Sequence, residues 1–91
     1  MYLAVCDDRP EELDRLVHLL QLWQTQHKTT LQYKTFRTAA ELLDAAEKER
    51  FTLYLLDVMM PGTNGLSAAR EIRSFDDSAD IVFLTSSTSY A

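Results

Sequence analysis

Glycine and cysteine are both scarce in this sequence of 91 residues, and their scarcity excludes several kinds of site. The two glycines, Gly62 and Gly65, lie in the second half of the chain, so no glycine-rich nucleotide-binding loop follows the first apolar segment. The single cysteine, Cys6, has no disulfide partner and offers no metal-site spacing, which fits a reducing compartment. We interpret it as a small buried side chain.

Positive charge and long apolar runs are scarce as well. Nine Lys and Arg residues stand against 14 Asp and Glu residues, and the net charge of −5 argues against a nucleic-acid surface, because phosphate backbones are bound by clustered basic side chains. No apolar stretch approaches the roughly 18 residues of a membrane span, and the N-terminus lacks the order of a signal peptide. We therefore expect a cytoplasmic protein that binds neither nucleic acid nor a membrane through this segment.

The length of the chain suits one domain, which we expect to span residues 1–91. Hydrophobic residues make up 46% of it, enough for a packed core. Apolar runs alternate with segments of helical spacing. Strands are predicted at 2–6, 31–36, 51–57 and 81–84, with the second at a sheet edge or exposed on one side, and helices at 10–26, 39–49 and 65–75. This β-α-β-α-β-α-β order implies an α/β fold, a parallel sheet with helices on both faces.

Local signals mark the helix starts and their buried faces. Thr38 followed by Glu41 forms a capping box, and Asn64 can cap the third helix. The inward positions of the second helix are predicted to be Leu42, Leu43 and Ala46, and those of the third Leu66, Ala69 and Ile72. For the first helix they are Leu13, Leu16, Val17, Leu20 and Trp23.

Acidic and hydroxyl side chains follow three of the four predicted strands. Asp7 and Asp8 end the first strand, Asp57 ends the third, and Thr85 ends the fourth. The functional site of an open parallel sheet lies outside the carboxyl ends of its strands, so these side chains are expected to meet. Three carboxylates so close repel one another unless a cation is present, and hard oxygen ligands with few protein contacts suit Mg²⁺. Such a carboxylate can attack phosphorus, and a nearby hydroxyl can bond a phosphoryl oxygen, roles that fit Asp57 and Thr85.

Four segments carry a resemblance to a known family, the receiver domains of two-component response regulators. They are Cys6-Asp7-Asp8, residues 55–62, Asn64-Gly65 and residues 83–86, and the resemblance spans essentially all 91 residues. It implies a flavodoxin-like three-layer fold with strand order 2-1-3-4. It also implies transfer of a phosphoryl group from a sensor histidine kinase to Asp57, in a regulatory domain that catalyses only its own phosphotransfer and dephosphorylation.

The resemblance also implies a role for each site residue. Asp8 and Asp57 would contact Mg²⁺ directly together with the backbone carbonyl of Met59, and Asp7 would act mainly through water. Thr85 would be the switch hydroxyl that is drawn toward the phosphoryl group. The chain further resembles receivers joined to LytTR-type DNA-binding domains, which would place a transcriptional output outside this segment.

The sequence departs from the family pattern at its C-terminal end. Complete receivers have a fifth strand and a fifth helix, with a lysine at the end of that strand, whereas here no lysine follows Lys48. We expect a C-terminally truncated piece of a longer regulator. In such a piece the strand at 81–84 would be a sheet edge, so self-association through it is expected.

Two alternatives stay open at this point. One is an interaction or dimerisation module that keeps the receiver fold and signals without phosphate. The other is an aspartyl-nucleophile phosphatase of the haloacid dehalogenase type, which wants a second acid two residues after the nucleophile. The sequence has Met59 there, so this alternative is weak.

Overall fold

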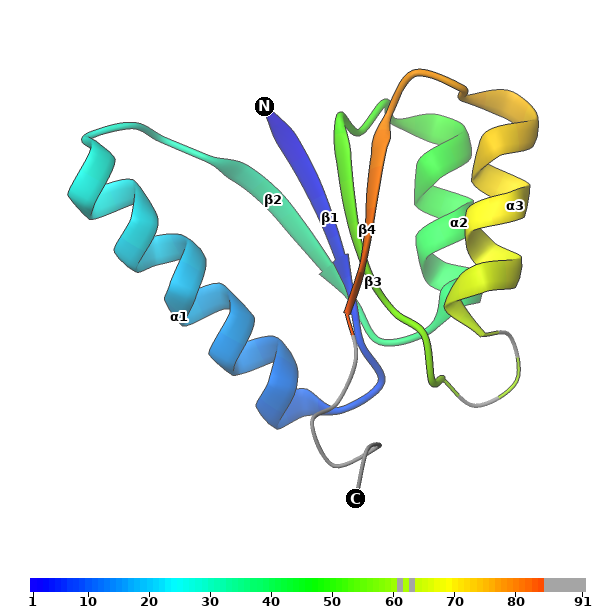
Figure 1. The fold of residues 1–91 in the computed structure, drawn as a ribbon, viewed down its shortest axis with the longest axis horizontal. Helices are drawn as coiled ribbons and strands as arrows, with labels where there is room; N and C mark the ends of the chain where they lie inside the picture. Colours follow the sequence, from blue (N-terminus) through cyan, green and yellow to red (C-terminus); the bar gives the residue numbers. More distant parts are fainter. Residues whose placement is uncertain (61, 63, 85–91) are drawn as a thin grey trace.

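The structure, a computed structural model, describes residues 1–60, 62 and 64–84 (Figure 1). Strands and helices alternate along the chain, as the sequence predicts. In order they are β1 (Tyr2–Cys6), α1 (Pro10–His27), β2 (Gln32–Phe36), α2 (Ala39–Lys48), β3 (Leu53–Asp57), α3 (Gly65–Phe75) and β4 (Asp80–Leu84).

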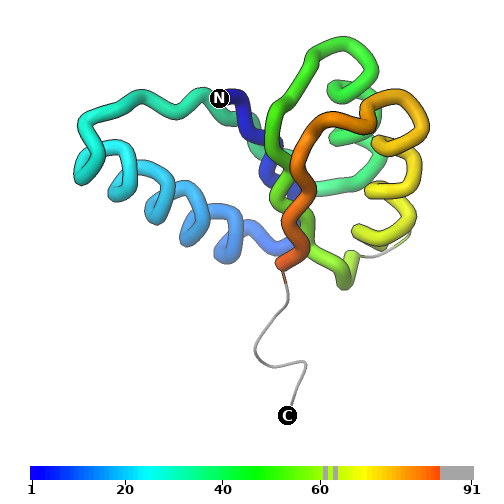
Figure 2. Tube along the Cα trace, turned by 45° about the horizontal axis from the view of Figure 1, so that its top comes forward, coloured from blue at the N-terminus to red at the C-terminus, as the bar shows by residue number. Residues whose placement is uncertain are grey.

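The four strands form one parallel sheet in the order β2-β1-β3-β4, which confirms the predicted flavodoxin-like arrangement. Helix α1 lies on one face of the sheet, and α2 and α3 lie side by side on the other (Figures 1 and 2). The register pairs Cys6 with both Phe36 and Leu56, and Asp57 with Leu84. The carboxyl ends of all four strands therefore lie along the same edge of the sheet.

The main core fills the space between the sheet and the pair α2–α3. Alternate residues of β1 and β3 point into it, because successive side chains of a strand face opposite sides. Fully buried members of this core are Ala4, Cys6, Leu42, Phe51, Tyr54, Leu56 and Ile72. The rings of Phe51 and Tyr54 pack edge to face with centroids 5.6 Å apart. The same packing holds the ends of β1 and β3 in fixed positions.

Both predicted caps are confirmed. The hydroxyl of Thr38 accepts a hydrogen bond of 3.2 Å from the backbone N–H of Glu41, and the side chain of Asn64 accepts one of 2.9 Å from Ser67. The predicted strand limits are too wide at two places, since Leu31 precedes β2 and Phe51, although buried, precedes β3.

Trp23, predicted to lie in the core or at its margin, lies at the margin, and the predicted inward position of Leu66 is wrong. Trp23 is 42% exposed and stacks on His27 along the surface of α1, with ring centroids 4.2 Å apart. Leu66 is 47% exposed, because the buried side of α3 passes through Gly65, Ala68, Ala69 and Ile72 and leaves Leu66 beside it. Spacing identifies a helix more reliably than it fixes which side of that helix is covered.

No helix in the described part of the chain is long and apolar enough to cross a membrane.

Candidate functional site

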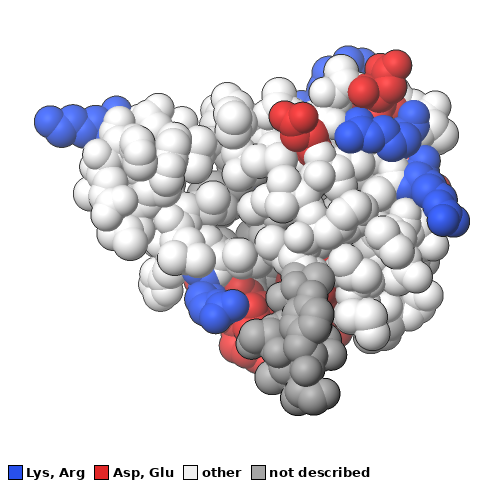
Figure 3. All heavy atoms as spheres, viewed as in Figure 1, with Lys and Arg blue, Asp and Glu red and all other residues white. Residues whose placement is uncertain are grey.

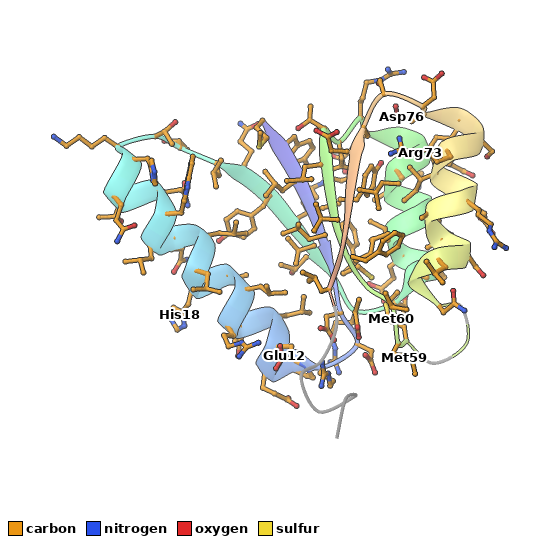
Figure 4. The ribbon with its side chains drawn as sticks, in the orientation of Figure 1. Glu12, His18, Met59, Met60, Arg73 and Asp76 are labelled. Atoms are coloured by element: carbon orange, nitrogen blue, oxygen red, sulfur yellow. The ribbon has the colours of Figure 1, made fainter. Side chains whose placement is uncertain are left out.

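Three of the predicted site residues meet at the carboxyl edge of the sheet. Asp7 and Asp8 follow β1, Asp57 closes β3, and one carboxylate oxygen from each lies within 4.8 Å of the others. Figure 4 shows this end of the sheet between the first turn of α1, where Glu12 is labelled, and the loop after β3 that carries Met59 and Met60. The strand order alone brings Asp7 and Asp8 beside Asp57, because β1 and β3 are neighbours.

Asp57 is held in place by backbone contacts on both sides. Its side chain is almost fully buried, and Oδ1 accepts a hydrogen bond of 3.3 Å from the backbone N–H of Met59. The next residue, Val58, donates its N–H to the carbonyl of Leu84 at 3.2 Å, so the end of β3 is tied to the end of β4. Such fixed geometry suits a carboxylate that has to meet a reacting group in one orientation.

Asp7 is buried close to two other negative charges. It is 2% exposed, and its Oδ1 accepts a hydrogen bond of 3.0 Å from the backbone N–H of Arg9. Burial raises the pKa of Asp7 above its usual range, the hydrogen bond from Arg9 lowers it in part, and the negative charges of Asp57 and Asp8 raise it further. The cluster thus costs free energy as long as nothing positive compensates it.

Asp8 provides the clearest sign that the cluster suits a cation. Its Oδ1 is buried and has no hydrogen-bond partner within residues 1–60, 62 and 64–84, although buried polar atoms are normally satisfied. A divalent cation at this place would give that oxygen a partner and relieve the repulsion among the three carboxylates. Oxygen donors of this kind are what Mg²⁺ prefers, so the residues present fit the predicted ion.

The side chains of Cys6 and Met60 form a contact between sulfur atoms next to the acidic cluster. The Sγ of Cys6 lies 3.5 Å from the Sδ of Met60, and both residues are buried. Burial, with a smaller effect of Asp7 and Asp57, raises the pKa of the Cys6 thiol to about 12. The thiol therefore stays protonated and inert, and the interpretation of Cys6 as a buried structural residue is confirmed.

Gly65 matters to the site in a way that the sequence pattern did not reveal. Its backbone N–H donates to the carbonyl of Val58 at 3.1 Å, so α3 begins directly against the end of β3. A Cβ at this position would collide with the backbone carbonyl oxygen of Asp57. The residue must be glycine for α3 to approach so closely, and only the three-dimensional packing of α3 against β3 reveals this need.

Arg9 is a second residue that the sequence reasoning missed. It follows the two acids directly, and its Nε lies 3.6 Å from Oδ1 of Asp7. A small cleft of about 90 Å³ opens here, lined by Asp7, Arg9, Glu12, Arg15, Leu16, Asp57 and Leu84. The position of a basic residue beside the acidic pair was the available signal.

The predicted roles of Thr85 and of the backbone carbonyl of Met59 stay predictions. Thr85 lies outside the described residues. The side chain of Met59 is 71% exposed, while its backbone carbonyl stays a predicted ligand.

Sequence comparison matches the chain to one family model and to bacterial regulatory proteins. The family model of the response regulator receiver domain matches residues 3–91. The chain is 33% identical over 75 residues to the transcriptional regulatory protein YkoG of Bacillus subtilis and 33% identical over 72 residues to the regulatory protein VanR of Enterococcus faecium. These matches cover 82% and 78% of this chain but only 32% and 28% of the two relatives, so the chain spans about a third of their length.

Solved structures agree in fold. The response regulator TrrA of Thermotoga maritima, in complex with Mg²⁺ and BeF, is 30% identical and superposes with a TM-score of 0.82 over 98% of this chain and 72% of its own. The same regulator in complex with the histidine kinase ThkA is 29% identical, with a TM-score of 0.76 over 93% of this chain and 68% of its own. YkoG, VanR and TrrA are not described as LytTR-type, so that resemblance stays a prediction.

The matched segment, residues 3–91, contains the described sheet except Tyr2, the first residue of β1, and it contains the three acids at the carboxyl edge. Its strand order and its resemblance to TrrA agree with the family assignment. This chain belongs to the family of response regulator receiver domains, the regulatory phosphoacceptor modules of two-component signalling.

Proposed function

We propose that Asp57 accepts a phosphoryl group from a sensor histidine kinase and that this modification controls an output outside the segment. The observation that carries the proposal is the meeting of Asp7, Asp8 and Asp57, with a carboxylate oxygen of each within 4.8 Å of the others. Membership of the receiver family supports a kinase as the donor, and the complex of ThkA with TrrA is an example of such a pair.

In the proposed reaction a carboxylate oxygen of Asp57 attacks the phosphorus of a phosphohistidine. The new P–O bond makes an acyl phosphate, the P–N bond breaks, and its electron pair stays on the imidazole of the kinase. Bound Mg²⁺ would neutralise charge on the phosphoryl oxygens. The N–H of Met59 keeps Asp57 oriented for the attack, since it donates to Oδ1 of that residue.

The ligand roles follow the resemblance of this chain to receivers. Mg²⁺ would be contacted directly by Asp8, Asp57 and the backbone carbonyl of Met59. Asp7 would interact with the ion through a water molecule. Oδ1 of Asp8 is buried and has no hydrogen-bond partner among the described residues, which supports a direct role for this residue. Oδ1 of Asp7 already accepts a hydrogen bond from the N–H of Arg9, which supports an indirect role. Thr85 would bond a phosphoryl oxygen and so sense the modification.

Mass spectrometry of the intact chain tests the proposal. Treatment with acetyl phosphate and Mg²⁺ should add one phosphoryl group to the unchanged chain, and Asp57→Asn should gain none, because the amide is not a nucleophile toward phosphorus. Asp44→Asn, which changes an exposed aspartate on α2, is the matched control and should be modified like the unchanged chain.

Equal labelling of Asp57→Asn and the unchanged chain would contradict Asp57 as the acceptor. Failure of the full-length regulator to gain a phosphoryl group at Asp57 would instead favour the alternative, a receiver-like interaction module that works without phosphate.

The wider setting belongs to the same proposal. YkoG is named a transcriptional regulatory protein, and this chain covers 32% of its length. We place a DNA-binding output domain outside the segment and the whole regulator in the cytoplasm, where kinases of this type present their phosphohistidine. The segment itself, with a net charge of −5, is a poor surface for DNA.

A second proposal concerns self-association through β4. This strand is an edge of the described sheet, and it exposes Val82 by 45% and Phe83 by 40%, on opposite faces of the sheet. An apolar edge strand with free backbone groups favours pairing with another chain. We therefore expect two copies of the chain to associate along β4.

A further inference from the structure

Arg9 interacts with the acidic cluster through both its backbone and its side chain. It precedes Pro10 at the start of α1, and its backbone N–H and its Nε both approach the same oxygen, Oδ1 of Asp7, at 3.0 Å and 3.6 Å. Its side chain is 36% exposed, whereas that of Asp7 is 3% exposed. One end of the ion pair is thus fixed in the protein interior and the other reaches toward solvent.

The side chain of Arg9 shares a cleft with two of the three aspartates. Asp7, Arg9 and Asp57 all line the small cleft beside the strand ends. Figure 3 shows acidic and basic side chains close together at the lower edge of the view. The other acid and base at the cleft, Glu12 and Arg15, bind each other at 3.0 Å. Arg9 therefore forms its ion pair with the three-aspartate cluster, through Asp7.

We propose that Arg9 is a built-in counter-cation of this cluster and that it lowers the affinity of the site for Mg²⁺. This inference rests on the proposed function, because it assumes that Mg²⁺ binds at Asp7, Asp8 and Asp57. In the metal-free state the guanidinium offsets the repulsion among the carboxylates. In the metal-bound state the ion and the guanidinium would both lie beside the same group of carboxylates, and these two positive charges would repel each other. Arg9 hence stabilises the metal-free state relative to the bound state and is a positioning residue for the site.

Isothermal titration with MgCl₂ separates this role from a structural one. Arg9→Gln removes the charge and keeps most of the side-chain length, and its Kd for Mg²⁺ should fall by about two- to fivefold, the effect of one partly exposed charge pair. Arg9→Lys keeps a positive charge and should bind Mg²⁺ like the unchanged chain. Arg50→Gln removes an arginine from the loop before β3, at the opposite end of that strand, and should not change the Kd.

Thermal unfolding gives a second readout on the same variants. Without metal, Arg9→Gln should melt at a lower temperature than the unchanged chain, and its gain on adding Mg²⁺ should be larger. Loss of a merely structural residue would weaken metal binding, so tighter binding by a less stable variant is specific to a counter-cation.

Two results would overturn this inference and leave the proposed function intact. One is a Kd for Mg²⁺ of Arg9→Gln that equals or exceeds that of the unchanged chain, and the other is an equal decrease of the Kd in Arg50→Gln. If the unchanged chain neither releases heat nor gains stability with Mg²⁺, the metal-binding part of the proposed function fails, and the inference fails with it.

Discussion

Asp7 carries a charge that the folded chain does not favour. Burial raises its pKa, and the neighbouring acids add to this effect. The folded state therefore holds a proton on Asp7 more tightly than the unfolded state does. As the pH rises through this raised pKa, the proton leaves and the free energy of unfolding decreases, so the cost is fully present at neutral pH.

Asp7→Asn should consequently stabilise the metal-free chain. At pH 7 with a chelator present, we expect the free energy of unfolding to increase, because the amide removes a buried charge and can still accept the hydrogen bond from Arg9. The gain should vanish as the pH falls below the ordinary range of carboxyl groups. Urea unfolding at several pH values measures it.

Asp77→Asn is the control, since it changes an exposed aspartate in the loop after α3. A loss of stability in Asp7→Asn at pH 7 would contradict the assignment of Asp7 as an electrostatic cost.

The sequence predicted the acids of the site well and their surroundings less well. Asp7, Asp8 and Asp57 were accessible to prediction because strand ends in a parallel sheet meet at one edge, whatever the packing details are. The roles of Gly65 and Arg9 were not, since one depends on how closely α3 approaches β3 and the other on a contact between side and main chains. Such contacts have no periodic signal in the sequence.

At the scale of elements, boundaries fixed by a local hydrogen bond were the easiest to predict. Thr38 and Asn64 each cap a helix through a bond to a residue three positions on, so the sequence contains the whole signal. The buried side of a helix depends instead on what lies opposite. Leu66 faces a groove shared with Ile81 and Phe83 rather than the core, and the spacing within α3 alone could not reveal this.

The edge strand β4 gives a prediction at this scale. In light scattering at micromolar concentration, the unchanged chain should show a mass above that of the monomer, and Val82→Lys should shift it toward the monomer, because a charged side chain on an edge strand opposes pairing. Gln32→Lys places the same charge on β2, the opposite edge of the sheet, and should leave the mass unchanged. A monomeric mass for the unchanged chain would refute association along β4.

The molecule as a whole is packed unequally on the two faces of its sheet. On the side of α2 and α3 the core residues are almost fully buried, as Leu42 and Ile72 illustrate. On the side of α1 an apolar groove of about 360 Å³ remains, lined by Met1, Leu3, Leu19, Leu20, Trp23, Leu31 and Leu53. Leu13 is the only residue of α1 with a buried side chain. Helix α1 thus has less apolar contact to hold it than its length suggests.

Matched leucine truncations should reveal this asymmetry. Leu42→Ala opens a cavity in the main core and should lower the free energy of unfolding by about 3 kcal/mol, within the range for buried leucines. Leu20→Ala, on the half-covered α1, should cost only about 1 kcal/mol, since the removed atoms border the groove and leave no closed cavity. Urea unfolding measures both. Equal losses would mean that the groove beside α1 is closed in solution, and the two faces of the sheet would then contribute alike to stability.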